Sequence, residues 1–282
     1  MLSIQNTLQQ AQEQLKMAGL VDSPGLDAEL LLCDALGVNR TYLFTWPEKI
    51  LTNQQTKDFA NGLQQRLLGK PIAHIIGHRE FWGLNLQVTP DTLIPRPDTE
   101  TLIEAVLEIH STHNSKPCGK ILDLGTGSGA IALALKSELP GYDVTAVDQS
   151  TAALDVAQQN AQQLNLQVNF LTSDWFSAIE GTFDFIVSNP PYIEDNDPHL
   201  QQGDVRFEPL SALTSGKDGL TDIKFIIYQA WSYLETQGWL LIEHGYNQAQ
   251  PIQTLLKEAG YQNITTKQDL GGNPRISLAQ KP

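Results

Sequence analysis

The sequence is poor in cysteine and contains no long apolar run. Cys33 and Cys118 are its only cysteines and form no CxxC pair, so neither a disulfide framework nor a thiolate zinc site is expected. No stretch of 18 apolar residues occurs. Residues 1–20 have no arginine and carry Glu13 among leucines at helical spacing, unlike a signal peptide. We therefore expect a cytoplasmic protein without membrane contact.

Basic residues are also scarce. The 18 Lys and Arg residues stand against 32 Asp and Glu, which gives a net charge of −14. Beyond residue 90 the net charge is −13, whereas before it the net charge is −1. Because phosphate contacts need basic side chains, this balance weighs against direct nucleic-acid binding and favours a basic protein partner. The six histidines show no metal-ligand spacing, so no metal is expected.

Three segments of the chain differ in their pattern. Residues 1–70 carry apolar residues at helical spacing, with Thr52 as a candidate N-cap, and predict a small helical bundle. Residues 71–97 predict a β-hairpin over 72–88 followed by a stiff proline-containing linker, after which Asp98 can cap a helix. Residues 98–282 alternate strand and helix, which predicts an α/β, doubly wound, Rossmann-like domain with a parallel sheet.

The first chemical motif is Asp123-Leu124-Gly125-Thr126-Gly127-Ser128-Gly129, which follows a predicted strand and opens a helix. Such a turn lets backbone approach a ligand and presents the free N–H groups of a helix N-terminus. Asp148 ends the next predicted strand, where a carboxylate can accept hydrogen bonds from both ribose hydroxyls. The pair predicts an adenosine-containing cofactor.

Glycine spacing alone does not identify that cofactor. Gly125-x-Gly127-x-x-Ala130 also satisfies the dinucleotide fingerprint and leaves NAD open. Asp123 favours S-adenosylmethionine, because an acid there could hold the cationic amino group of a methionine moiety through water but would repel a pyrophosphate. Trp175 follows the third predicted strand and is interpreted either as an adenine contact or as a core residue.

The second motif is Asn189-Pro190-Pro191-Tyr192, directly after a predicted strand. A planar amide or amine nitrogen is a poor nucleophile, and two acceptors that grip its N–H groups would orient it and favour charge build-up during methylation. The side-chain oxygen of Asn189 and the carbonyl of Pro190 are such acceptors. The two prolines hold that carbonyl rigidly, and Tyr192 offers an aromatic surface to a flat group.

Together these residues resemble the release factor glutamine methyltransferases, the HemK or PrmC family. The resemblance covers nearly the whole chain and rests on GKPIAHIIGHREFWG, LIPRPDTE, DLGTGSG, VSNPPY and GDVRFEP. It implies methylation of the glutamine amide nitrogen (N5) in the Gly-Gly-Gln motif of peptide-chain release factors, in a bacterial cytoplasm. It further implies that Gly125–Gly129, Asp148 and Trp175 bind the cofactor and that Asn189–Tyr192 hold the glutamine. Asn189 is also expected to contact the cofactor. One departure is His74, where many members carry Tyr.

Three other readings remain open at this point. A nucleic-acid amino-group methyltransferase could use the same Asn-Pro-Pro-Tyr grip on adenine N6 or guanine N2, and the acidic charge weighs against it. A cofactor-binding sensor or an assembly factor would keep the fold without catalysis, and the presence of both the cofactor loop and the Asn-Pro-Pro-Tyr clamp argues against it. An NAD-dependent oxidoreductase depends on the ambiguous glycine spacing alone.

Overall fold

The computed structural model describes residues 2–113 and 116–282. The chain forms two compact units. Unit 1 comprises Met1–His78 together with Gln201–Phe207, and unit 2 comprises Arg79–Leu200 and Glu208–Pro282. Unit 1 therefore includes a short segment that interrupts the sequence of unit 2. In the part of the chain that the structure describes, no helix is both long and apolar enough to cross a membrane.

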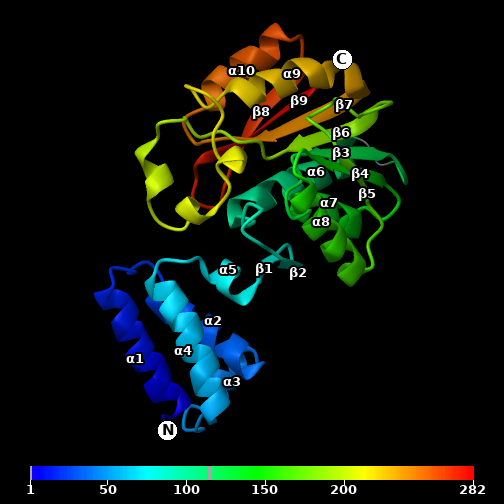
Figure 1. The fold of residues 1–282 in the computed structure, drawn as a ribbon. Coiled ribbons are helices and arrows are strands. Elements are labelled where there is room, and N and C mark those ends of the chain that lie inside the picture. Colours follow the sequence, from blue (N-terminus) through cyan, green and yellow to red (C-terminus); the bar gives the residue numbers. More distant parts are fainter. Residues whose placement is uncertain (1, 114–115) are drawn as a thin grey trace. The chain divides into compact units, whose positions relative to one another are not determined.

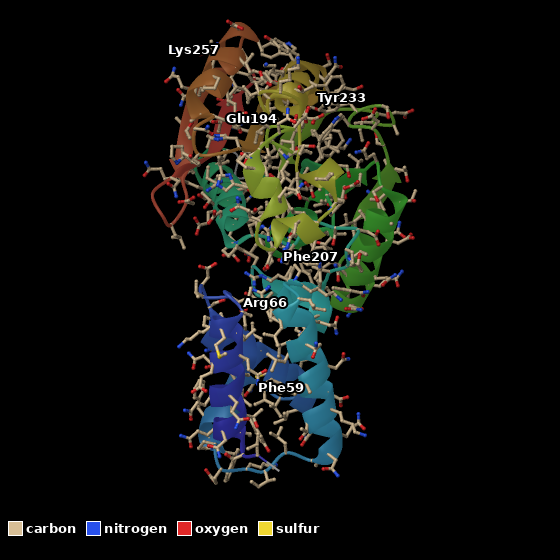
Figure 2. The ribbon with its side chains drawn as sticks, turned by 60° about the vertical axis from the view of Figure 1, so that its left-hand side comes forward. Phe59, Arg66, Glu194, Phe207, Tyr233 and Lys257 are labelled. Atoms are coloured by element: carbon tan, nitrogen blue, oxygen red, sulfur yellow. The ribbon has the colours of Figure 1, made fainter. Side chains whose placement is uncertain are left out.

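Unit 1 is a bundle of helices, drawn from blue to cyan in Figure 1. Its helices are α1 (Ile4–Met17), α2 (Pro24–Leu36), α3 (Arg40–Thr45), α4 (Asn53–Leu67) and α5 (Ile72–Ile76). Thr52 is the N-cap of α4, as the sequence predicts, and forms a capping box with Gln55. Phe59 of α4 points into the bundle (Figure 2) and is buried in its apolar core. The helical spacing of residues 1–70 therefore produced a single packed core.

Arg66 of α4 joins separate parts of unit 1. Its Nε donates to Asp27 of α2 at 2.7 Å, and its Nη1 donates to Asp204 at 2.8 Å. Arg66 and Asp27 are both buried, and the Ser23 hydroxyl donates to Asp27 as well. Because a buried charge is stable only when it is paired, this network fixes Gln201–Phe207 to the helical bundle.

The segment 72–88 was predicted as one hairpin, and this is wrong for its first five residues. Residues 72–76 form α5, and the hairpin consists of β1 (His78–Phe81) and β2 (Leu84–Gln87). Ile72, Ile75 and Ile76 lie at helical spacing and pack against the core of unit 1, so burial overrode their strand preference. His74 is consequently a buried helix residue and not part of the hairpin.

Asp98 also differs from its prediction as a helix cap. It lies inside a short 3-10 helix, η1 (Pro97–Thr99), which leads directly into α6 (Glu100–His113). Its carboxylate pairs with Arg275 at 3.2 Å. The Asp98 carboxylate, which the local sequence predicts as a helix cap, is therefore paired with a residue that is distant in the chain.

Unit 2 is built on a seven-stranded sheet with the order β5-β4-β3-β6-β7-β9-β8. Its strands are β3 (Lys120–Leu124), β4 (Asp143–Asp148), β5 (Asn169–Thr172), β6 (Phe183–Ser188), β7 (Leu234–Glu243), β8 (Gln262–Gln268) and β9 (Pro274–Gln280). The pairs among β3, β4, β5, β6 and β7 are parallel, as predicted. β9 is antiparallel to both β7 and β8. The five residues between β8 and β9 are too few for a parallel crossover, so these two strands pair antiparallel.

Helices cover both faces of this sheet. On one face lie α6, α7 (Ala130–Glu138) and α8 (Thr151–Leu164), and on the other lie α9 (Thr221–Tyr233) and α10 (Ala249–Glu258), as Figure 1 shows. Successive strand residues alternate between the two cores: Phe185 of β6 packs with the first set of helices and Ile186 with the second. The structure thus has the predicted α/β, Rossmann-like architecture preceded by a helical bundle and a hairpin.

Candidate active site

The sheet order places three loops at one edge. Strands β4, β3 and β6 are adjacent and parallel, so Asp148, Gly125 and Asn189 lie at their neighbouring carboxyl ends. Ser188 pairs with Leu124 across the two strands, and its hydroxyl donates to the Leu124 carbonyl at 2.8 Å. The two sequence motifs, 64 residues apart, are therefore fixed side by side.

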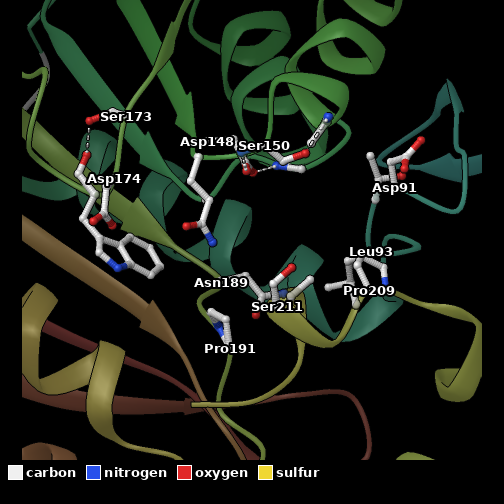
Figure 3. A pocket seen from close by; sticks show the side chains of 17 residues that line it. Asp91, Leu93, Asp148, Ser150, Ser173, Asp174, Asn189, Pro191, Pro209 and Ser211 are labelled. Atoms are coloured by element: carbon white, nitrogen blue, oxygen red, sulfur yellow. Dashed lines mark hydrogen bonds between the residues drawn. The ribbon is translucent and has the colours of Figure 1, made fainter. Parts of the chain in front are cut away.

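A pocket opens at this edge of unit 2 (Figure 3). Its lining residues come from the carboxyl ends of the strands and from two further segments: Asp91, Thr92, Leu93, Gly125, Gly127, Asp148, Gln149, Ser150, Ala153, Ser173, Asp174, Trp175, Asn189, Pro191, Pro209, Ser211 and Ala212. The pocket thus combines the glycine loop, the acid that ends β4 and the Asn-Pro-Pro-Tyr segment in one cavity, as the sequence predicts for a ligand site.

Asp148 is held by two backbone donors. The N–H of Gly127 donates to Oδ2 and the N–H of Ser150 donates to Oδ1, each at 2.9 Å. A carboxylate oxygen has two lone pairs, so each oxygen keeps one for a ligand hydroxyl. Gly127 adopts φ +55°, a conformation that glycine reaches without strain. The glycine loop and Asp148 therefore form one preorganised structure.

Asp123 lies behind the glycine loop and does not line the pocket. It is fully buried, and its Oδ2 accepts hydrogen bonds from the Thr126 hydroxyl at 2.6 Å and the Ala132 N–H at 3.2 Å. Its Oδ1 has no hydrogen-bond partner among the described residues. Burial raises the pKa of this carboxyl to about 7. Asp123 holds the loop to the start of α7, and its second oxygen is an open acceptor.

The rest of the glycine motif serves packing. A side chain at Gly129 would meet the Cβ of Ala157 at 3.1 Å, so glycine allows α7 and α8 to approach closely. Ser128 is buried, and its carbonyl accepts from Asn160 Nδ2 at 2.9 Å. Asn160 also donates to the Gln87 carbonyl of the hairpin at 3.0 Å. No local pattern predicts this role of Asn160, because its partners lie 32 and 73 residues away.

Trp175 both lines the pocket and packs partly against the core, so both interpretations of it describe part of its environment. It adopts φ +48°, which a large side chain rarely does, and the Ser173 hydroxyl stabilises this turn by donating to its carbonyl at 2.8 Å. Its ring lies 3.5 Å from the position that a Cβ of Gly125 would occupy. The indole is thereby set beside the glycine loop.

The Asn189-Pro190-Pro191-Tyr192 segment is oriented by contacts on both sides. Asn189 Nδ2 donates to Thr99 Oγ1 at 3.3 Å, which leaves its Oδ1 without a donor from the described residues. Pro191 lines the pocket, whereas Pro190 is buried. Tyr192 packs against the α9 and α10 core, and its carbonyl accepts from Gln248 Nε2 at 3.0 Å. Asn189 therefore lines the pocket with its Nδ2 bound to Thr99 and its Oδ1 available as an acceptor.

Comparison with known proteins identifies the family of this chain. Residues 6–77 match the family described as PrmC N-terminal domain, and residues 99–204 match the methyltransferase small domain. The release factor glutamine methyltransferase of Vibrio cholerae is 50% identical over 282 residues, covering 99% of this chain and 97% of its own. The Escherichia coli K12 protein of the same name is 47% identical over 281 residues, covering 99% of both. The chain belongs to the release factor glutamine methyltransferase family. Its cofactor is S-adenosylmethionine.

Solved structures show the same fold at lower identity. A methyltransferase from Pyrococcus furiosus has a TM-score of 0.54 at 20% identity and covers 79% of this chain and 98% of its own. The hMettl16 catalytic domain in complex with a MAT2A 3'UTR hairpin has a TM-score of 0.59 at 20% identity and covers 78% of this chain and 82% of its own. The methyltransferase fold of this family member is thus shared with enzymes of distant sequence.

The sequence analysis of this release factor glutamine methyltransferase family member did not predict two walls of the pocket. One wall is residues 91–93, directly before the Ile-Pro-Arg-Pro linker, and the other is residues 209–212, directly after Gly-Asp-Val-Arg-Phe-Glu. Glu208 joins these regions, because its carboxylate accepts from Arg96 at 2.6 Å and from the Ile94 N–H at 3.4 Å. Both walls adjoin motifs that carried the family resemblance, and this adjacency is the sequence feature that could have identified them as pocket residues.

Proposed function

We propose that this chain transfers a methyl group from S-adenosylmethionine to the side-chain amide nitrogen, N5, of the glutamine in the Gly-Gly-Gln motif of peptide-chain release factors. The relatives that carry the name release factor glutamine methyltransferase are 47–50% identical over nearly the full chain and support this substrate. The observation that carries the proposal is the orientation of Asn189, whose Nδ2 is bound to Thr99 while Oδ1 is left for a substrate N–H.

The pocket fits the cofactor by the chemistry of its residues. When bound, S-adenosylmethionine supplies an electrophilic methyl group. Asp148 would accept the ribose hydroxyls, Trp175 would contact the adenine, and the backbone of Gly125–Gly129 would lie along the methionine side. The open Oδ1 of the buried Asp123 suits a bridging water to the amino group. Thr126 and Ser128 would support cofactor binding indirectly, because their hydrogen bonds to Asp123 and Asn160 fix the glycine loop.

Asn189, Pro190 and Tyr192 would make up the catalytic clamp, and Pro191 would complete the substrate contact. The amide nitrogen of glutamine is delocalised, so Asn189 Oδ1 and the Pro190 carbonyl would accept its two N–H groups and direct the nitrogen toward the methyl carbon. The nitrogen becomes acidic as it is alkylated, so it can release its proton to solvent water without a dedicated base. Positioning, rather than proton abstraction, is therefore the main contribution of these residues.

The partner and location follow from the same reading. The protein substrate is a release factor, and the reaction takes place in the cytoplasm of a bacterium. It involves no direct nucleic-acid contact, no membrane contact and no metal. Residues 1–70 would recognise the release factor, and residues 98–282 would carry out methyl transfer. Residues 71–97 would connect these two parts of the chain. The concentration of negative charge beyond residue 90 supports a basic protein surface as the partner of the catalytic part.

The proposal is tested by incubating the full chain with labelled S-adenosylmethionine and an intact release factor, and locating the methyl group by mass spectrometry. We expect one methyl on the glutamine of Gly-Gly-Gln and none on a matched release factor in which this glutamine is alanine. Methylation of the alanine variant would overturn the substrate assignment.

A further inference from the structure

Gln248 carries a buried side-chain amide that the proposed function leaves without a role. It directly precedes α10, is 8% exposed and does not line the pocket. Its Nε2 donates to the Tyr192 carbonyl at 3.0 Å and to the Gly219 carbonyl at 3.4 Å. The last residue of the Asn-Pro-Pro-Tyr segment is therefore bound by a side chain that lies outside the pocket.

The partners of Gln248 determine which end of its amide faces Tyr192. Its Oε1 accepts from the Gly245 N–H at 2.8 Å, and a backbone N–H can only donate. The Tyr192 and Gly219 carbonyls at the Nε2 end can only accept. A reversed amide would place donor against donor and acceptor against acceptor. Backbone groups on both sides thus fix the orientation of this amide.

The backbone of Gln248 is itself held at both of its polar groups. Its N–H donates to the Gly245 carbonyl at 2.9 Å, and its carbonyl accepts from the Ile252 N–H at 3.1 Å. Ile252 and Leu256 of α10 are buried in the core of unit 2. Gln248 therefore connects the Tyr192 carbonyl to a helix that is packed in the core.

Gly219 shows how closely another part of the chain approaches this carbonyl. A Cβ at Gly219 would lie 2.3 Å from the Tyr192 oxygen and 2.8 Å from Gln248 Nε2, and its φ of +66° also favours glycine. The chain leaves the clamp at Tyr192 and returns beside it at Gly219. The intervening residues 193–218 include a pocket wall and the segment 201–207 of unit 1. Gln248 thus holds the end of the clamp where this long segment begins.

We propose that Gln248 is a positioning residue for methyl transfer, which fixes the carboxyl-terminal end of the clamp formed by residues 189–192. This inference rests on the proposed function. The other end of the clamp is fixed by β6, where Ser188 pairs with Leu124 and donates to its carbonyl. Between two fixed ends, prolines with a restricted φ leave the Pro190 carbonyl little freedom to turn away from a substrate N–H.

The first test is single-turnover transfer to an intact release factor by a variant without the donor. Gln248→Met keeps the length of the side chain, and we expect the rate to fall about 10- to 100-fold, because a small misplacement of a reacting group costs this much. Gln253→Met is the matched control on the same helix, since the hydrogen bond that it loses goes to Thr266 of β8. This control should retain the wild-type rate.

Gly219→Ala tests the same contact from the other side. The added methyl group would displace the Tyr192 carbonyl from Gln248, so we expect a loss of similar size. Gly181→Ala is its control, because Gly181 has φ +83° and an added Cβ would meet no atom of the described residues within 4 Å. It imposes comparable backbone strain before the opposite end of β6 and should retain the wild-type rate. This second pair decides the matter if Gln248→Met does not fold.

A separation of rate from binding distinguishes positioning from a general structural role. The affinity for S-adenosylmethionine, measured by calorimetry, and the KM for the release factor should stay close to wild type in all four variants. A wild-type chain that does not methylate the glutamine of Gly-Gly-Gln would overturn the proposed function. Wild-type transfer with an undiminished rate in folded Gln248→Met, with parallel losses of rate and cofactor affinity, or with equal losses in Gln253→Met, would overturn the positioning role alone.

Discussion

Asp148 accepts a hydrogen bond from the backbone N–H of Gly127 at 2.9 Å, so the acid that ends β4 and the glycine loop that follows β3 hold one another in place. The other carboxylate oxygen accepts from Ser150. The carboxylate is thereby aimed into the pocket before any ligand arrives, as Figure 3 shows for Asp148 and Ser150. Preorganisation of this kind reduces the ordering cost of binding.

Asp148→Ala should weaken S-adenosylmethionine binding about 10- to 100-fold in a folded protein. Two charge-assisted hydrogen bonds of roughly 1.5–3 kcal/mol each set the upper limit, and replacement water lowers the net loss. Asp143→Ala, at the exposed opposite end of β4, is the control and should bind normally. Calorimetric titration measures both affinities, and equal affinity in the two variants would contradict the ribose assignment.

Asn189→Ala should reduce single-turnover methyl transfer by about 10²- to 10³-fold while cofactor binding persists. The loss corresponds to removal of one preorganised acceptor at the reacting group. Asn189→Asp keeps an acceptor of nearly the same shape, so residual transfer above the Asn189→Ala level is expected. Quenched-flow transfer to an intact release factor gives the rates, and a rate in Asn189→Ala close to wild type would refute the clamp.

Arg66→Met should destabilise unit 1 by about 3 kcal/mol, because it leaves the buried carboxylate of Asp27 without its cationic partner. Arg40→Met, which breaks the exposed pair of Arg40 with Glu29, is the matched control and should cost at most about 1 kcal/mol. Hydrogen exchange of the α2 and α4 amides in the full chain reports the difference. Equal protection in the two variants would show that the buried pair contributes little.

Asp123 should make the stability of unit 2 depend on pH. The pKa of its carboxyl is raised to about 7 in the folded chain and returns toward its ordinary value of 3.8 on unfolding. The folded state therefore binds this proton more tightly, and the stability it contributes is complete below about pH 4 and lost as pH rises through 7. Wild type should thus lose stability relative to Asp123→Asn over this range, by no more than about 4 kcal/mol.

Urea unfolding of both proteins at several pH values, without cofactor, measures that difference. Comparison with Asp123→Asn cancels the contribution of Glu243, whose pKa is raised in the same direction. A difference between the two proteins that stays constant from pH 4 to 8 would mean that the buried Asp123 is not the titrating group.

Naked DNA or RNA should bind weakly and should not be methylated. The residues beyond 90 carry a net charge of −13, which opposes the phosphate contacts that nucleic acid requires. Fluorescence anisotropy with a duplex and with an rRNA fragment at several salt concentrations tests this expectation. Tight binding that falls steeply with salt, together with transfer to adenine N6 or guanine N2, would favour the nucleic-acid alternative.

Most elements, and the positions of the two motifs on them, could be predicted from local sequence, with residues 72–76 as an exception. The Thr52 cap, the strand that ends at Asp148 and the strand that ends at Ser188 lie where local pattern predicts them. This works because capping, strand alternation and glycine turns depend on residues a few positions apart. Since parallel strands place their carboxyl ends at one edge, the sequence also predicts that the glycine loop and Asn189 share that edge. The sheet order, which makes β3 and β6 neighbours, comes from the tertiary structure.

The distant residues that complete each feature are known only from the folded structure. Asp98 pairs with Arg275 instead of capping a helix, and the orientation of Asn189 depends on Thr99, 90 residues earlier in the chain. Asp204 joins Arg66 across 138 residues, which places a segment from within unit 2's sequence on the bundle. The physical reason is that buried polar groups take whichever partner the fold brings within hydrogen-bonding distance, and no local pattern records that choice.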